Sequence, residues 1–311
     1  IQMDLPKNLR LVTDIVTRWN STYLMIQRIV LLKPALVSTL ATIGGLNVHI
    51  SGSEWDLLQQ VCQVLKIFED ATKMLSSATA SISEVLPILD EILCQLETTK
   101  KDHGIIGWKN GLMEGMLSRF SHYESLDEYS LATFFNTKYK GYCFRNPSTL
   151  EAVKAKIYNK LEAILVTDEN YDHGNDGEQP VMQNFNSLQS ALDARIKKKQ
   201  TFFNSGANQM RHEIRECLDA YSNSNTEPDV IEFWKHKSQS LKPLDRELAK
   251  LAQFYLTPPP TSVDVERLFS TAGDILTNER STLNPENAEK ILFCRENFKH
   301  VNFQYQSAIN A

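Results

Sequence analysis

The sequence predicts a mainly α-helical protein, and two observations lead to that prediction. Apolar residues recur every three or four positions through most of the 311-residue chain, which is the spacing that places side chains on one face of a helix. No stretch shows the sustained alternation of apolar and polar residues that a half-buried strand requires. The apolar content of 42% and the charged content of 23% are ordinary for a globular protein, so a packed core is expected.

The first half of the chain contains several predicted helices. The first covers residues 22–40 and is broken at Pro34, and residues 44–52 form a loop. Ser53, with Asp56 three positions later, predicts the N-cap of a helix over residues 53–75. The same apolar spacing predicts helices over residues 83–98, 107–123 and 150–166. Core positions are expected for Tyr23, Trp55 and Trp108.

The second half begins with a segment of different composition. Residues 167–183 are acidic, contain two glycines and a proline, and have few apolar side chains, so a mobile loop is expected. Helical spacing returns over residues 184–217, with a break near 204–206, and again over residues 228–237 and 243–256. Trp234, Phe254 and Tyr255 are interpreted as packing residues in these helices.

The most informative segment covers residues 254–297. Thr261 or Ser262 is expected to cap a helix that follows the three prolines at 258–260. Asn284, followed by Pro285, is the cap of a second helix, because proline suits the first helical position. The apolar side of that second helix includes Ile291 and Leu292. The apolar stripe of the first helix consists of Val265, Leu268, Phe269 and Ala272, and Glu266 lies off it.

This segment resembles the C-terminal signature of the hAT (hobo/Ac/Tam3) transposase superfamily. The matching positions, in fixed order, are Val265-Glu266-Arg267, Phe269-Ser270, Ala272-Gly273, Arg280, Leu283 and Pro285. A second family motif is similar to the stretch from Asp14 to Tyr23, which includes Arg18, Trp19 and Asn20. A weaker likeness lies at residues 132–140, where Asn136-Thr137-Lys138 replaces the Asp-Pro-Arg of the family.

The resemblance implies a fold and a domain division. Residues 1–240 would form the all-helical insertion domain of the family, and residues 241–311 its C-terminal dimerisation segment. The segment would supply the last helices of an RNase H-like domain whose sheet is largely absent from this chain. An apolar face would then be exposed and would pair with another copy of the chain. The residues expected to make that contact are Val265, Leu268, Phe269, Ile291 and Leu292.

The resemblance also implies a catalytic role for Glu266, as the last of three acids. The alternative is a surface carboxylate near a helix N-terminus, where the helix dipole favours a negative charge. In the family the other two are aspartates upstream of the Arg-Trp motif, and this chain opens only about eighteen residues before Trp19. Two-metal chemistry needs several carboxylates to hold two cations, so the chain alone is expected to bind no metal cofactor and to be catalytically incomplete. The alternative is part of an active DNA transposase that uses Mg²⁺ or Mn²⁺, with both aspartates upstream.

DNA is a second expected partner, although the net charge of −5 argues against a main DNA-binding module. Trp19 either stacks on an exposed base or packs in a core. Arg267 and Arg280 either contact phosphates or pair with nearby acids, and Arg18 belongs to the same expected DNA-binding set. The basic cluster Arg195–Lys199 is either a solvated helix end or a DNA contact.

Other classes of partner and site are not expected. No run of about eighteen apolar residues indicates a membrane span, and no feature indicates a small-molecule substrate. The scattered cysteines, Cys62, Cys94, Cys143, Cys217 and Cys294, lack the spacing of a zinc site or a disulfide framework. In the family a zinc-binding BED finger lies upstream, and the resemblance implies a nuclear protein.

Overall fold

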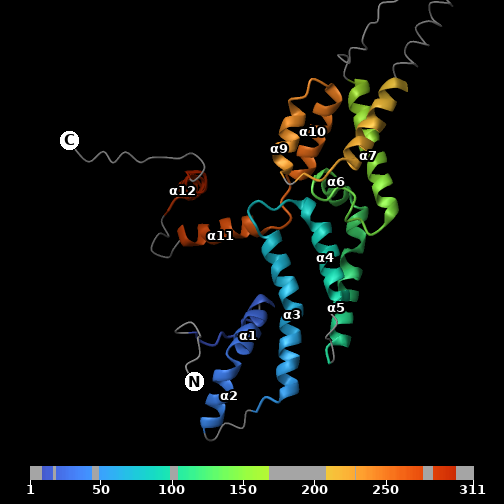
Figure 1. The fold of residues 1–311 in the computed structure, drawn as a ribbon. Coiled ribbons are helices and arrows are strands. Elements are labelled where there is room, and N and C mark those ends of the chain that lie inside the picture. Colours follow the sequence, from blue (N-terminus) through green and yellow to red (C-terminus); the bar gives the residue numbers. More distant parts are fainter. Residues whose placement is uncertain are drawn as a thin grey trace, which may run out of the picture.

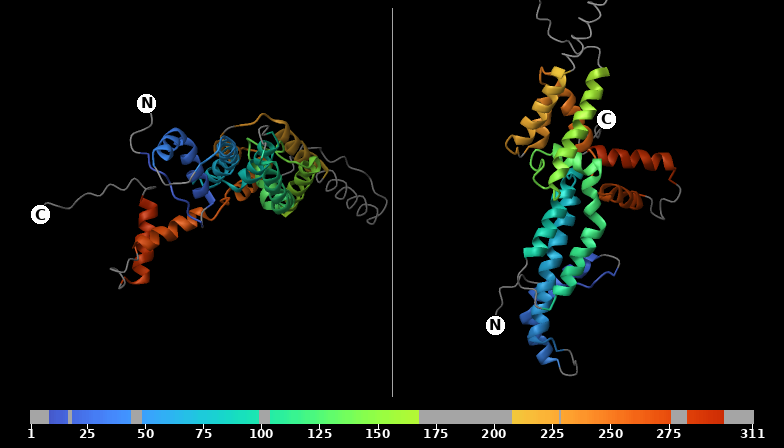
Figure 2. Two further views of the ribbon diagram at one scale, coloured as in Figure 1. Left: turned by 90° about the horizontal axis from the view of Figure 1, so that it is seen from below. Right: turned by 90° about the vertical axis from the view of Figure 1, so that its right-hand side faces the viewer.

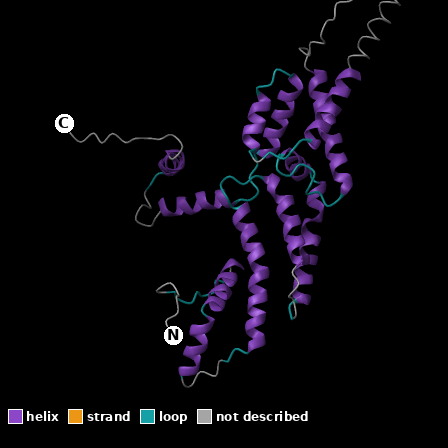
Figure 3. Ribbon diagram, in the orientation of Figure 1, coloured by secondary structure: helices purple, strands orange, loops and turns teal. Residues whose placement is uncertain are grey.

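The computed structural model describes residues 9–16, 19–43, 49–98, 104–167, 208–227, 229–275 and 283–298. Within these ranges the secondary structure is helical and contains no strand, which confirms the predicted fold class (Figures 1 and 3). The N-terminal helices are α1 Trp19–Leu31, α2 Lys33–Thr42, α3 Gly52–Leu75, α4 Val85–Thr98 and α5 Ile106–Phe120, with 3₁₀ turns η1 Ile82–Glu84 and η2 Ser121–Ser125. The later helices are α6 Asp127–Phe135, α7 Pro147–Thr167, a helix at residues 208–223, α9 Val230–Ser238, α10 Pro243–Leu256, α11 Val263–Ile275 and α12 Pro285–Asn297.

The beginning of α3 corrects one prediction. Ser51, rather than Ser53, is the N-cap residue, and its hydroxyl accepts a hydrogen bond from the backbone amide of Glu54 at 3.3 Å. The Glu54 carboxylate in turn accepts from the Ser51 amide at 2.7 Å, so the two residues form a capping box. Ser53 lies inside the first turn of the helix. The predicted break at Pro34 is confirmed, because α1 ends at Leu31 and Pro34 lies in the first turn of α2.

A lower core lies among α3, α4 and α5. Its buried side chains include Val64 on α3 and Ile88, Ile92 and Leu96 on α4, with Leu112, Met113 and Met116 of α5 packed against them. On another side of α3 lies α1, with Tyr23 buried between the two helices. Trp55 is buried as predicted. The core prediction for Trp108 was wrong, because this residue lies in the first turn of α5 with 39% of its surface exposed.

An upper core surrounds α6. The side chains of Phe134 and Phe135 are fully buried there among α7, the helix at 208–223, α9 and α10. Two aromatic residues also form hydrogen bonds with the backbone at the end of α6. The Trp234 indole N–H donates to the Phe135 carbonyl at 2.8 Å. The Tyr221 hydroxyl lies 3.0 Å from the carbonyls of Phe134 and Phe135. Trp234 and Tyr255 are therefore packing residues, as predicted.

Two further sequence predictions have different outcomes in this region. Phe254 is exposed, so its packing prediction was wrong; it neighbours Tyr255 on α10, where adjacent side chains point to different faces. The predicted loop at 167–183 lies outside the described residues, except for Thr167 at the end of α7. The domain boundary placed between residues 240 and 241 stays a prediction, and α9 and α10, on its two sides, pack into the same core.

A buried polar network surrounds the turn that follows α6. The Asn136 side-chain amide donates to the Ser83 hydroxyl at 2.9 Å, which links the turn after α6 to η1. In the same turn, Lys140 has a left-handed backbone with φ of 48° and only 1% exposure. Its ammonium donates to the Ser224 carbonyl and hydroxyl, both at 2.7 Å, and to the Asn225 carbonyl at 2.9 Å. Burial lowers the pKa of Lys140 from its ordinary value.

Few helices in the described part of the chain approach the length and composition that a membrane span requires. No single helix there is long and apolar enough to cross a bilayer, and only the pair at residues 20–31 and 33–42, bent by 71°, reaches the required length and composition together.

Candidate self-association surface

The connection between α10 and α11 is fastened to the lower bundle by hydrogen bonds. The Ser81 hydroxyl donates to the Leu256 carbonyl at 2.7 Å, and the Ile82 amide donates to the Pro258 carbonyl at 2.9 Å. Beyond the prolines, the Arg267 guanidinium donates to the Ser76 carbonyl at 2.8 Å. These contacts place the N-terminal half of α11 beside the C-terminal end of α3.

The local sequence accounts for the starts of both C-terminal helices. The Thr261 hydroxyl accepts a hydrogen bond from the Val263 amide at 3.4 Å, immediately before α11 begins. The Asn284 side chain accepts from the Glu286 amide at 3.0 Å, and Pro285 is the first residue of α12. The predicted cap at Asn284 is therefore confirmed, and α11 begins directly after the two residues predicted to cap it.

We call α11 and α12 together the arm. Figures 1 and 2 show that the arm projects from one side of the helical body, away from both cores. Its two helices contact each other, and no residue of α12 is buried. The arm therefore presents side chains that the rest of the described chain leaves uncovered.

Several of those side chains are large and apolar. Phe269 is 70% exposed, and Val265 and Leu268 on the same stripe of α11 are also exposed. On α12, Ile291 is exposed and Leu292 is half-buried. The structure adds two exposed aromatic residues that the sequence analysis did not select, Phe293 and Phe298. Phe293 lies off the apolar stripe of α12, so helical spacing directed attention away from it.

Within the described part of the chain, Glu266 has no neighbouring set of metal ligands. Its carboxylate accepts a hydrogen bond from the Ser262 hydroxyl at 2.8 Å, and the nearby Asp264 carboxylate pairs with Arg267 at 2.9 Å. Among the described residues there is no group of three His, Cys, Asp or Glu side chains that could hold a metal ion. A two-cation centre needs several convergent carboxylates, so the residues described here do not fit one.

The residues expected to contact DNA are only partly described. Arg267 pairs with Asp264 and with a backbone carbonyl, so of its two predicted alternatives the structure shows the pairing with a nearby acid. Arg18, Arg280 and the cluster Arg195–Lys199 lie outside the described residues. Trp19 is the first residue of α1, and its side chain is likewise outside the description.

Asp14 holds the entry to α1 in place. Its carboxylate accepts hydrogen bonds from the hydroxyls of Ser21 and Thr22, the latter at 3.0 Å. The Ser21 bond is the main cause of a lowered pKa for Asp14. The Ser21 hydroxyl also accepts from the Ile15 amide at 2.7 Å. These motif residues bond to one another and connect residues 14 and 15 to the first turn of α1.

Two family descriptions match the chain. Residues 213–298 match the hAT family C-terminal dimerisation region, which covers part of the upper core and the whole arm. The chain carries a hAT dimerisation region. Residues 1–64, which include α1, α2 and the first half of α3, match the ZBED1 RNase-like helical domain.

Curated relatives agree with these matches, and the chain is homologous to BED zinc finger proteins. The human zinc finger BED domain-containing protein 4 is 27% identical over 95% of this chain and 25% of its own length. The human zinc finger BED domain-containing protein 6 is 24% identical over 97% of the chain and 33% of its own length. The putative transcriptional regulator tpeD of Talaromyces stipitatus is 24% identical over 90% of the chain and 31% of its own length. The chain thus spans a quarter to a third of these relatives.

Proposed function

We propose that this chain is the C-terminal part of a hAT transposase-derived protein and that its hAT dimerisation region self-associates through the arm. The observation that supports this proposal is the exposure of Phe269, Val265 and Ile291 on a pair of helices that stands away from both cores. Contiguous exposed apolar side chains of this size are typical of protein contact surfaces. The product is a homodimer or a higher oligomer.

The energetics agree with a stable contact. Burial of a Leu, Val or Phe side chain contributes about 1.5–3 kcal/mol when it is complete. Association costs roughly 4–15 kcal/mol in lost translational and rotational freedom. The exposed residues of two arms are numerous enough to exceed the lower part of that range, so burial of the arm surface favours association.

Light scattering at tens of micromolar, set on the order of the micromolar affinity scale, tests the proposal. The wild-type chain should have at least twice the mass of a monomer, and Phe269→Asp should shift it to the monomer. Leu241→Asp is the matched control, because Leu241 is 95% exposed on the loop before α10 and lies outside the arm. A wild-type chain that stays monomeric at these concentrations refutes the proposal.

The same proposal makes the chain catalytically incomplete by itself. Glu266 would act only with acids supplied from elsewhere, and the chain alone binds neither Mg²⁺ nor Mn²⁺ at a catalytic centre. Incubation of supercoiled DNA with either cation should therefore give no nicking. Metal-dependent nicking that Glu266→Ala abolishes would support the alternative, in which the chain belongs to an active DNA transposase with both aspartates upstream.

The proposal also includes DNA binding and nuclear localisation, which rest on the relatives and on the motif around Trp19. Binding should be weak and independent of sequence. Its affinity should fall with salt along a shallow slope, because a few phosphate contacts release only a few counterions. Trp19 would favour hairpin or single-stranded DNA over duplex, since base stacking on an aromatic ring contributes about 1–3 kcal/mol. Fluorescence anisotropy with matched probes tests this preference, and equal affinity for both probes that Trp19→Ala leaves unchanged would exclude it.

A further inference from the structure

The start of the arm completes the C-terminal end of α3. The last carbonyl groups of a helix have no hydrogen-bond partner inside that helix. At the end of α3, the Leu75 carbonyl accepts a hydrogen bond from the Thr261 hydroxyl at 3.4 Å. The Ser76 carbonyl accepts one from the Arg267 guanidinium at 2.8 Å. A cation suits this position, because the helix dipole places negative charge at the C-terminus of a helix.

Arg267 forms a second bond from the same guanidinium. One of its nitrogens donates to the Ser76 carbonyl, and another donates to the carboxylate of Asp264, one turn earlier on α11, at 2.9 Å. A guanidinium holds its donors in a planar fork of fixed geometry. The two bonds together therefore constrain the direction in which α11 leaves the end of α3. We call the bonds from Thr261 and Arg267 to the end of α3 the latch.

The latch is of modest strength and can open. The side chains of Arg267 and Asp264 are both 55% exposed, so water competes for these groups. Within the described residues, α11 packs chiefly against α12. An open latch would leave the Pro258 carbonyl bonded to the Ile82 amide, so the arm would turn at the residues between the prolines and α11. Neither core would be disturbed.

The closed latch keeps the apolar face of the arm available. With the latch closed the arm points away from the body (Figures 1 and 2), and Val265, Leu268 and Phe269 stay exposed. The body also carries exposed apolar residues, such as Phe254 on α10 with 71% exposure. An arm that is free to turn would bury its apolar side chains against such residues of its own chain, since burial of apolar surface is favourable.

We infer that the latch holds the arm in the orientation that a second copy of the chain recognises, which makes Arg267 a positioning residue for self-association. The inference rests on the proposed self-association and names what controls it. It gives Arg267 a role other than the phosphate contact considered from the sequence. If only a fraction of the arms is latched, the apparent dissociation constant rises in inverse proportion to that fraction.

Arg267→Ala opens the latch and tests the inference with two measurements. Dyes carried by non-natural residues at Gln59 on α3 and Asn287 on α12, both exposed positions, report the direction of the arm by energy transfer in dilute monomer. The wild type should give one narrow distribution of distances, and the variant a broad one. In sedimentation equilibrium the variant should raise the dissociation constant by about threefold to tenfold, the range expected for one lost hydrogen bond.

Two further variants serve as controls. Arg246 is also an exposed arginine that donates to two backbone carbonyls, those of Ser240 and Leu241, but it lies on α10 outside the arm. Arg246→Ala should therefore change neither measurement. Arg267→Lys keeps the charge and loses the fork, so its dissociation constant should fall between those of the wild type and Arg267→Ala. An unchanged circular dichroism spectrum shows that each variant is folded.

The outcomes separate the inference from the proposed function. If the wild type stays monomeric, the proposed function fails and the inference fails with it. If the wild type associates and Arg267→Ala associates equally well or more tightly, the inference is overturned and self-association stands. An unchanged distribution of dye distances in Arg267→Ala also overturns it. If that variant loses only affinity for DNA, the phosphate contact is the role of Arg267.

Discussion

At the scale of single residues, Lys140 organises the turn that follows α6. Its buried ammonium meets three acceptors on Ser224 and Asn225, and it lies 5.1 Å from the centre of the Tyr221 ring. A buried cation is stable only when such partners replace water. The left-handed backbone at Lys140 therefore persists because the side chain is anchored more than 80 residues further along the chain.

Replacement of this side chain should destabilise the fold. Lys140→Met removes all three donors and leaves the acceptors at residues 224 and 225 without them, which should lower the free energy of unfolding by about 1–3 kcal/mol. Urea denaturation followed by circular dichroism measures the change. Lys138→Met is the control, because Lys138 is exposed in the same turn and should change stability by less than about 0.5 kcal/mol. Equal effects of the two variants would contradict the anchoring role.

Tyr221 makes the upper core sensitive to alkaline pH. Burial raises the pKa of Tyr221 far above its ordinary value of 10.0, while in the unfolded chain it titrates near that value. The unfolded state therefore loses the proton first, so the contribution of Tyr221 is complete below pH 10 and is lost as the pH rises above it. Burial also raises the pKa values of Tyr129 and Tyr139. Their contribution to the loss of stability at alkaline pH remains in any Tyr221 variant.

Tyr221→Phe separates these effects. At pH 7 the variant should be less stable by about 1 kcal/mol, because the hydroxyl no longer donates to the carbonyls at the end of α6. Between pH 9.5 and 11 it should lose less stability than the wild type, so the two curves converge. Denaturation midpoints measured across this range give the comparison, and parallel curves would show that Tyr221 does not titrate on unfolding.

At the scale of helices, the sequence shows where a helix lies better than where it begins. α10 was predicted with its observed bounds, because proline precedes an uninterrupted apolar stripe. The cap of α3 was placed two residues late, because Ser51 and Ser53 both precede an acidic residue by three positions. Only the extended backbone of Ser51, with ψ of 164°, identifies the residue that caps the helix.

The two serines make a direct test of the capping box. Ser51→Ala should lower the free energy of unfolding by about 1 kcal/mol, since it removes the acceptor for the Glu54 amide. Ser53→Ala, in the first turn, should lower the free energy of unfolding by only about a few tenths of a kcal/mol, as an ordinary surface substitution does. Thermal unfolding of both variants shows which serine caps the helix. A larger loss of stability for Ser53→Ala than for Ser51→Ala would support the sequence prediction that Ser53 is the N-cap.

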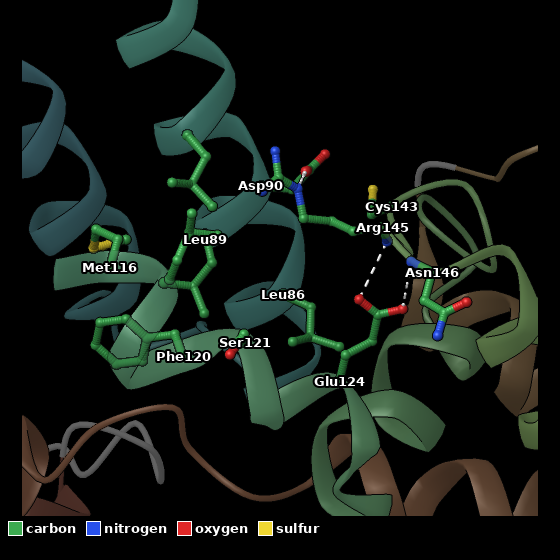
Figure 4. A pocket seen from close by; sticks show the side chains of 12 residues that line it. Leu86, Leu89, Asp90, Met116, Phe120, Ser121, Glu124, Cys143, Arg145 and Asn146 are labelled. Carbon is green, nitrogen blue, oxygen red and sulfur yellow. Dashed lines mark hydrogen bonds and ion pairs between the residues drawn. The ribbon is translucent and has the colours of Figure 1, made fainter. Parts of the chain in front are cut away.

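The candidate surface was predictable to a similar extent. Helical spacing identified Val265, Leu268 and Phe269, and their exposure agrees with the expected contact role, which stays a prediction. Phe293 could not be found in this way, because an apolar residue off the main stripe has no periodic signal. The pocket between α4 and α5 (Figure 4) could not be predicted either, since its lining combines two helices with a turn whose position depends on Arg145 and Glu124.

At the scale of the whole molecule, the two cores and the arm should differ in local stability. Side chains of α6 and α10 are buried in the upper core, whereas α12 has no buried residue. Segments with few buried contacts open with free energies far below that of global unfolding. The arm should therefore exchange its amide hydrogens before the cores do.

Hydrogen exchange at two concentrations uses this difference to report association. At high concentration, peptides from α12 should become protected, because the partner covers them, while peptides from α10 should exchange at an unchanged rate. The concentration at which protection appears should match the concentration at which light scattering shows association. Protection that rises equally in both helices would indicate general stabilisation and not a contact of the arm.

The three prolines between α10 and α11 have a consequence for the thermodynamics of assembly. A proline run is stiff, since each ring fixes its own φ and restricts the preceding residue, and here the Pro258 carbonyl is also bonded to Ile82. The orientation of the arm is thus largely set before any partner arrives. Ordering a flexible linker during assembly would cost roughly 1–2 kcal/mol per residue of backbone entropy. In this chain most of that entropy is already lost when the proline linker folds. Replacement of the prolines by glycines would leave every contact atom in place and still make pairing less favourable.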